Sequence, residues 1–189
     1  MKAYFSVAFI AIMFIVMIHF RSFTQGLIVI LMVPLGIIGS TWGHGLEGVQ
    51  VSMLSVWGMV ALSGVIINDA VVFLSKYNSN LKLGMNPEAA VIGAGKARFR
   101  AIVLTTITTS VGLYPLILEN SFQAQFLIPM AIALAYGVLV GTFFILTLFP
   151  IIILVLNDIR RKTREFWEGE KVNPIDVEPA IKEAKVTLD

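Results

Sequence analysis

The run that decides the fold occupies residues 52–75 and reads SMLSVWGMVALSGVIINDAVVFLS. A helix of about 20 residues crosses the hydrocarbon core of a bilayer, and this run is long enough. Asn68 and Asp69 lie inside it, although an amide and a carboxyl group are costly among lipid tails. The run therefore predicts a membrane-spanning helix whose polar side chains face a cavity or another helix.

The rest of the 189-residue chain has the same character, with 57% hydrophobic and 14% charged residues. Soluble domains carry about 25% charged residues, so the composition predicts an all-α polytopic membrane protein. The net charge of +2 favours contact with membrane lipid headgroups and gives no reason to expect a nucleic acid partner. Cysteine is absent, which excludes disulfides and thiolate metal sites.

The apolar runs predict five membrane-spanning helices, which form a transmembrane helical domain over residues 1–157. A short surface helix is expected at 87–96, because Asn86, Pro87 and Glu88 combine an N-cap, an N1 proline and an early acid. Residues 158–189 read as a charged, poorly packed cytoplasmic tail. The predicted spans are residues 3–20, 26–42, 52–75, 101–118 and 126–156.

Orientation follows from the 14 lysine and arginine residues. With the N-terminus outside, every one of them except Lys2 falls on the cytoplasmic side, as the positive-inside rule requires. The chain is therefore predicted to be N-out and C-in. An N-out start without a signal sequence suggests that a periplasmic segment and further helices precede these residues in a longer protein.

Asp69 is the leading functional candidate, because an enclosed carboxyl group favours its neutral form and so can take part in a proton-coupled step. The alternative is an aspartate that reaches water or pairs with a basic residue. Asn68 could bond across to a neighbouring helix, with Gly64 one turn earlier allowing close approach. Helix packing is also the expected role of three further glycines, Gly36, Gly137 and Gly141.

The predicted fourth span is rich in hydroxyl groups, including Thr105, and about half of such groups bond back to their own helix. Arg98 precedes this span and is expected to be a topology determinant. His19 and His44 have no second ligand at metal spacing. Enzyme motifs are missing as well, so no metal, cofactor or catalytic residue is predicted.

Four segments in order resemble the last five helices of resistance-nodulation-division (RND) efflux transporters. They are VPLGIIGS from Val33, GVIINDAVVFL from Gly64, RFRAIVLTTITTSVGLYPL from Arg98 and FFILTLFPIIILV from Phe143. The resemblance covers residues 4–155 and implies half of an RND-type helix bundle in the bacterial inner membrane. It also implies proton antiport, export of drugs or other small hydrophobic compounds, a homotrimer, a periplasmic adaptor and an outer-membrane channel.

The resemblance also assigns relay positions. The family threonine falls on Thr105 and the family arginine on Arg98, whereas the family lysine falls on Asn68. This departure removes a cation, and Asp69 beside it adds a carboxylate. We therefore expect Asn68 and Asp69 to form the polar centre of this half, in a lineage outside the best-known multidrug pumps.

Two other readings compete with a transporter half that needs its N-terminal half. One is a small membrane scaffold or assembly module that oligomerises through its glycine faces, and the other is the equivalent part of a lipid or protein exporter. The periplasmic porter domain and the first seven helices of the family are missing from these residues. A truncated gene, a split subunit and an excised fragment are equally compatible with that, and the residues that choose the substrate would lie in the missing parts.

Overall fold

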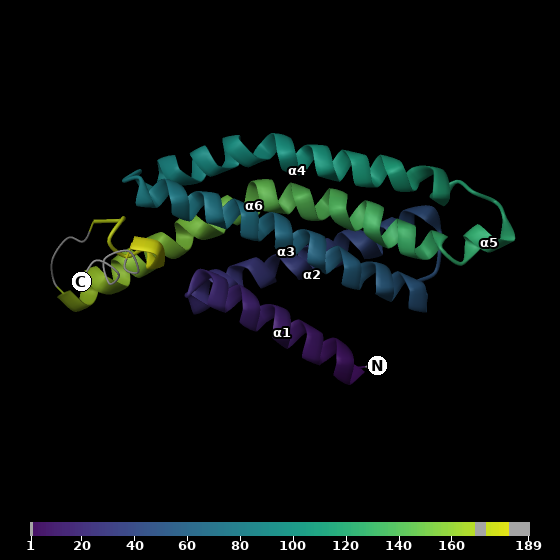
Figure 1. Ribbon diagram of the computed structural model, residues 1–189, viewed down its shortest axis with the longest axis horizontal. Coiled ribbons are helices and arrows are strands. Elements are labelled where there is room, and N and C mark those ends of the chain that lie inside the picture. Colours follow the sequence, from purple (N-terminus) through teal and green to yellow (C-terminus); the bar gives the residue numbers. More distant parts are fainter. Residues whose placement is uncertain (1, 169–172, 182–189) are drawn as a thin grey trace. The chain divides into compact units, whose positions relative to one another are not determined.

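The computed structural model describes residues 2–168 and 173–181, with side chains from residue 10 to 167 and from 173 to 181. The described residues are mostly helical and contain no strand. The predicted all-α class is thereby confirmed. The helices, in chain order, are α1 (Lys2–Phe20), α2 (Phe23–Glu47), α3 (Met53–Lys82), α4 (Pro87–Ile117), α5 (Phe122–Gln125) and α6 (Ile128–Glu168) (Figure 1).

Four of these helices, α2, α3, α4 and α6, are long and apolar enough to cross a membrane by length and composition. In α1 the residues with described side chains, Ile10–Phe20, form a shorter apolar stretch. Helix α6 has 41 residues, or about 60 Å at 1.5 Å per residue. It is therefore about twice as long as the hydrocarbon core is thick.

The helix ends follow local chemistry. Ser22 precedes α2 and its hydroxyl accepts from the Gln25 amide at 3.5 Å. Ser52 precedes α3 and exchanges such contacts with Ser55 at 3.0 and 3.4 Å, so both serines supply acceptors for unpaired helix amides. Gly48 after α2 and Gly84 after α3 have positive φ angles of 66° and 82°, which glycine adopts without a Cβ clash.

Several boundaries differ from the sequence prediction. The surface helix at 87–96 and the span at 101–118 are one continuous helix, α4. The break was expected from the basic residues between them, but lysine and arginine are good helix formers and leave the backbone unbroken. Helices α2 and α3 also run beyond the expected residues, and α6 continues through the start of the expected tail to Glu168.

The helices divide into two compact units. Unit 1 comprises Met1–Ile30, Val71–Lys96 and Pro150–Asp189, and unit 2 comprises Leu31–Ala70 and Ala97–Phe149. Helices α2, α3, α4 and α6 each contribute one segment to each unit. The four candidate relay residues that the sequence singled out all belong to unit 2.

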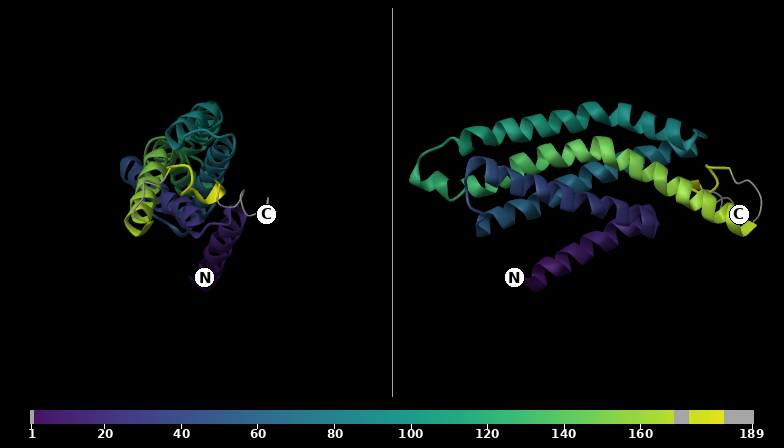
Figure 2. Two further views of the ribbon diagram at one scale, coloured as in Figure 1. Left: turned by 90° about the vertical axis from the view of Figure 1, so that its left-hand side faces the viewer. Right: turned by 180° about the vertical axis from the view of Figure 1, so that it is seen from behind.

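Unit 2 is held together by close helix approach. The α2 and α3 segments lie alongside α6 (Figure 2), and a side chain at Gly43 would come within 2.5 Å of the Cβ of Tyr136. A Cβ at Gly58 would come within 2.8 Å of the Met130 carbonyl oxygen. Small residues therefore set how near these backbones lie, which is the usual device of helices packed in lipid.

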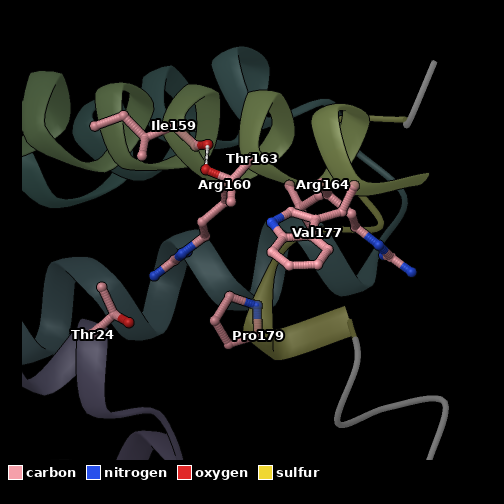
Figure 3. A pocket seen from close by; sticks show the side chains of 8 residues that line it. Thr24, Ile159, Arg160, Thr163, Arg164, Val177 and Pro179 are labelled. Atoms are coloured by element: carbon pink, nitrogen blue, oxygen red, sulfur yellow. Dashed lines mark hydrogen bonds between the residues drawn. The ribbon is translucent and has the colours of Figure 1, made fainter. Parts of the chain in front are cut away.

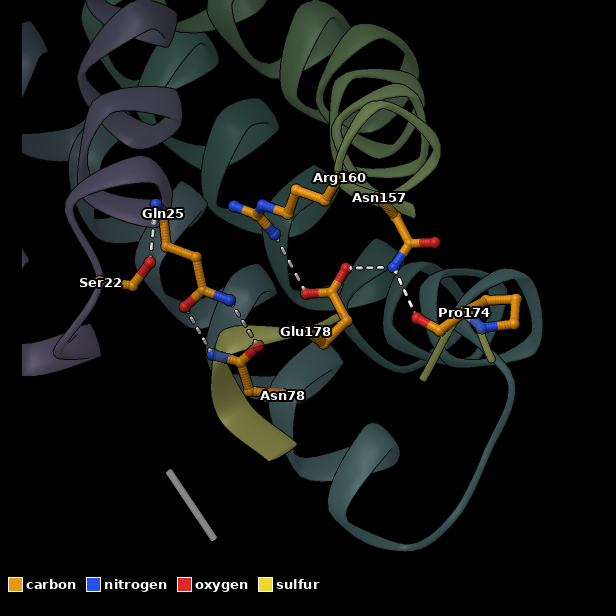
Figure 4. Close-up of polar contacts among 7 residues, drawn as sticks. All are labelled: Ser22, Gln25, Asn78, Asn157, Arg160, Pro174 and Glu178. Carbon is orange, nitrogen blue, oxygen red and sulfur yellow. Dashed lines mark hydrogen bonds and ion pairs between the residues drawn. The ribbon is translucent and has the colours of Figure 1, made fainter. Parts of the chain in front are cut away.

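Unit 1 relies on side-chain amides instead. Gln25 and Asn78 form two reciprocal hydrogen bonds of 3.0 Å between α2 and α3 (Figure 4). Asn80 donates to the carbonyl of Ala90 at 3.0 Å, joining α3 to α4. These bonds pin the helix ends around buried Tyr77, which is fully enclosed.

Part of the expected tail is packed. Residues 173–181 return to unit 1, where the side chain of Glu178 is 1% exposed. Its carboxylate accepts from Asn157 at 2.6 Å and lies 3.4 Å from Arg160 (Figure 4). Residues 173–181 are therefore packed, and the prediction of a poorly packed tail is wrong for them. Residues 169–172 and 182–189 lie outside the described part of the chain, so the tail stays a prediction for them.

Candidate functional site

Asp69 lies in α3 with 9% of its surface exposed. None of the described residues donates a hydrogen bond to its carboxyl group. The residue is thus enclosed by the packing of α3, as the sequence suggested, but it has no basic partner within the described chain.

Asn68, the residue before Asp69, lies on a different face of α3. Its side chain is exposed on the surface of the chain, since neighbouring residues on a helix project about 100° apart. Gly64, one turn earlier on the same face, is also exposed and has no atom within 4 Å of where a Cβ would lie. The close approach expected at Gly64 is therefore not made by any described part of this chain.

Helix α4 divides its hydroxyl groups between two faces. Thr105 and Thr108 are exposed, and each bonds only to carbonyls of its own helix. Thr106 is buried and its hydroxyl lies 2.6 Å from that of Thr142 on α6, while Ser110 donates to the Ala135 carbonyl at 3.2 Å. The buried pair joins α4 to α6, and the exposed pair remains available to another surface.

Arg98 lies near the start of the unit 2 segment of α4. It is half-buried, and its Nε atom is enclosed without a hydrogen-bond partner in the described chain. No hydrogen bond between described residues links Arg98, Asn68, Asp69 and Thr105. The structure thus places the four predicted relay residues in one unit and leaves their polar groups unconnected.

Three of the four predicted packing glycines lie at contacts. A side chain at Gly36 would collide with Ile66, and one at Gly137 would collide with Leu62. At Gly141 an added Cβ would lie 2.9 Å from the tip of Ile66. Only Gly64 faces open space.

His44, for which the sequence suggested no role, lies within α2 and is 3% exposed. One ring nitrogen is 2.9 Å from the Ser40 carbonyl and the other is 2.7 Å from the Ser55 hydroxyl. The histidine thus ties the end of α2 to the start of α3.

The described residues form no evident metal-binding site. Among the described residues there is no group of three or more histidine, cysteine, aspartate or glutamate side chains that could hold a metal ion. The site is a set of isolated polar groups in spanning helices. Together with the fold, it defines the chain as part of a polytopic membrane protein.

The comparisons with known proteins identify the family. The model of the AcrB/AcrD/AcrF family matches residues 1–157, so the chain belongs to this family of RND efflux transporters. The resemblance of the four sequence segments is thereby confirmed. Members of the family are transporters and not enzymes in the usual sense.

Two similar proteins are informative. The nickel and cobalt resistance protein CnrA of Cupriavidus metallidurans is 30% identical over 131 residues, which are 69% of this chain and 12% of CnrA. The crystal structure of a heavy metal efflux pump has the same fold with a TM-score of 0.72 at 24% identity, over 82% of this chain and 15% of the pump. The chain thus spans about an eighth of the length of the curated relative.

Proposed function

We propose that the chain is the C-terminal membrane part of a proton-driven efflux transporter in the bacterial inner membrane. The observation that carries the proposal is the exposed position of Asn68 in a spanning helix of an RND family member. A side-chain amide facing lipid tails would lack partners. Its exposure therefore calls for a further protein surface that covers it.

The face around Asn68 fits such a surface. Gly64 and Asn68 on α3 are both exposed, and on α4 the exposed residues Thr105, Thr108 and Gly112 form a similar small and polar face. Small residues let backbones approach, and hydroxyl and amide groups bond across helices in lipid. We assign these faces to contact with the N-terminal half of the transporter.

Asp69 is the proposed site of proton binding in this half. Its enclosure and the lack of a donor among the described residues support this role. The family's lysine position holds Asn68, so no cation at that position would hold a nearby carboxylate ionised. Thr105 and Arg98 are the proposed partners of the relay once the N-terminal half is present.

The working assembly follows from the family. We propose residues 1–157 as the membrane domain, oriented N-out and C-in, in a homotrimer with a periplasmic adaptor and an outer-membrane channel. The family match favours this over the scaffold module and over a lipid or protein exporter.

Two substrate classes are open to the transporter. Drugs or other small hydrophobic compounds are the substrates that the family resemblance implies. Divalent transition-metal cations are the second candidate, because CnrA is named for nickel and cobalt resistance and the similar fold is that of a heavy metal efflux pump. We favour the metal cations on the strength of that relative.

The test uses the full-length transporter in cells that lack other pumps. Asp69→Asn removes the titratable proton at nearly constant shape and is expected to lower export about 100-fold, the scale of a lost proton-transfer group. Export is followed with Ni²⁺ and Co²⁺ resistance in one arm and with efflux of the dye ethidium in the other. The arm that responds to the intact transporter assigns the substrate class.

Asp158→Asn is the matched control, since it removes an exposed carboxylate from α6 and should leave export unchanged. Wild-type export in the Asp69→Asn protein would refute the proton-binding role. Gly64→Leu separates the partner interface from the chemistry: it should be tolerated by this chain alone and should abolish assembly with the N-terminal half.

A further inference from the structure

The part of α6 that belongs to unit 1 carries an exposed apolar face. Ile151, Val155 and Ile159 are 56%, 49% and 53% exposed, and Phe166 is 87% exposed. At about 100° per residue these four positions fall within about 80° of one another around the helix. Lys162, which is also exposed, lies on the same side, between Ile159 and Phe166. These five residues form one continuous strip, here called the outer face.

The other side of the same turns is covered by the chain itself. Arg160 and Thr163 line an open cavity of about 580 Å³, together with Thr24 of α2 and the returning segment 173–181 (Figure 3). Ile159 also borders this cavity and stands at the edge between the two sides. The outer face is therefore the side of α6 that the described part of unit 1 leaves uncovered.

Thr24 fixes the level of these turns relative to the bilayer. It lies in the first turn of α2, just after the turn between α1 and α2 and two residues before the span expected at 26–42. Because Thr24 and Thr163 line the same cavity, these turns of α6 lie at the edge of the membrane. The positive-inside rule assigns that edge to the cytoplasmic leaflet.

The composition of the outer face suits the boundary between lipid headgroups and acyl chains. Ile151 and Val155 are exposed on a helix that is apolar enough to span the membrane, so the outer face continues a surface that already contacts lipid. Phe166 gains free energy at the boundary by burying its ring. Lys162 can reach a phosphate while its methylene stem stays in apolar surroundings.

We propose that Ile159, Lys162 and Phe166 form an interfacial anchor that lies against the cytoplasmic leaflet. Phe166 places its ring just below the headgroups, and Lys162 contacts a lipid phosphate. An upright helix would carry Phe166 about 16 Å beyond Val155, past a headgroup layer of roughly 5–8 Å, so these turns of α6 lie obliquely. The proposal depends on neither the transported substrate nor proton coupling.

The test places a nitroxide label at Phe166→Cys in the full-length transporter, reconstituted in lipid bilayers. Residues 1–189 contain no cysteine, so the label is unique once cysteines elsewhere in the transporter are replaced. Collisions with oxygen, which concentrates in lipid, and with a water-soluble nickel chelate report the depth of the label. The label at Phe166 should collide mainly with oxygen. A label at Arg161→Cys, on the charged side of α6 near Asp158, is the control and should collide mainly with the chelate.

Two results would contradict the anchor. A label at Phe166 that collides mainly with the nickel chelate would place the outer face in water. A label that is shielded from both reagents would show that protein covers this face, either a second copy of the chain or the N-terminal half. Either result would overturn the assignment to lipid.

Phe166→Gln tests whether the ring holds the anchor, with a label at Lys162→Cys as the reporter. The water-exposed population of that label should rise about tenfold, as expected when roughly 60 Å² of apolar surface is no longer buried. Glu165→Gln is the matched control, because it changes the neighbouring residue and leaves the outer face intact, and the population should stay unchanged. An equal rise in the two variants, or no rise in Phe166→Gln, would refute the role of the ring.

Discussion

The two units of the chain hold their helices together by different means. In unit 2 the contacts are steric, made at glycines such as Gly43 and Gly58, with a few hydroxyl bonds between helices. In unit 1 they are amide and ionic, as in the pairs Gln25–Asn78 and Arg160–Glu178. The difference matches where the sequence places these contacts: the glycines lie within or next to predicted spans, and the amide and ionic pairs lie beyond the ends of the spans.

The comparison shows which interactions can stabilise helix contacts among lipid tails and which can do so near the headgroups. Apolar side chains gain little by leaving lipid tails for a helix interface, so close packing has to supply the attraction. Near the headgroups water competes for polar groups, and enclosed amide pairs remain favourable there because leaving them unpaired is costly. Substitutions in the two units should therefore fail for different reasons.

The largest effect is expected in unit 2, from Gly58→Ala. The new Cβ would lie 2.8 Å from the backbone carbonyl oxygen of Met130, and backbone cannot move aside as a side-chain tip can. The free energy of unfolding should fall by about 3 kcal/mol, as in other overpacked cores. It is measured from helix content in mixed detergent and sodium dodecyl sulfate micelles.

Gly64→Ala on the same helix is the control for that loss. It faces open space, so alanine should be neutral or stabilising by up to about 1 kcal/mol through its helix propensity. Equal losses at the two positions would mean that glycine packing does not hold unit 2.

A smaller effect is expected in unit 1, from Glu178→Ala. Removal of this carboxylate takes one acceptor from Asn157, which keeps its bond to the Pro174 carbonyl, and the acceptor of Arg160, which costs about 2 kcal/mol. Residues 173–181 should then exchange their amide hydrogens about 30-fold faster in a mass-spectrometric exchange measurement. Asp158→Asn breaks only a surface contact of 3.7 Å with Arg161, and unchanged exchange is expected there.

The amide pair of unit 1 should follow at about 1 kcal/mol. A double-mutant cycle of Gln25→Leu and Asn78→Leu isolates the coupling between the two side chains, and two hydrogen bonds of 3.0 Å predict a favourable coupling of that size. Additive losses in the cycle would contradict a direct bond and would weaken the contrast between the units.

The smallest effect is expected for the hydroxyl pair of unit 2. Thr142→Val removes the bond to Thr106 while keeping the shape of the side chain. Hydrogen bonds between helices in lipid contribute about 0.6 kcal/mol on average, so the unfolding midpoint should move only slightly. A loss as large as that of Gly58→Ala would show that polar bonds, and not close packing, dominate unit 2.

Much of the fold could be read from the sequence because span length and apolar runs are local properties. The helix start at Pro87 and the packing roles of Gly36 and Gly137 also follow from local patterns. The continuity of α4 and the burial of Glu178 could not be read in this way. From the sequence alone, a charged stretch is typical of a loop or a tail. The contacts of Glu178 with Asn157 and Arg160 join residues far apart in the sequence and form only in the folded chain.

The candidate site, too, could be predicted only in part from the sequence. Asp69 could be selected from the cost of a carboxyl group in an apolar run, and the structure encloses it. The sequence could not tell which of Asn68 and Asp69 faces inward, since both orientations fit an unbroken helix. That choice depends on the surfaces on either side of α3, one of which the N-terminal half is proposed to supply.

Pro150 lies within α6, at the residue where that helix passes from unit 2 into unit 1. Proline has no backbone N–H, so the carbonyl of Leu146 lacks its usual helical donor, and the ring crowds that carbonyl as well. Bending is therefore easier here than elsewhere along these 41 residues. Any bending of α6 should therefore be concentrated at Pro150.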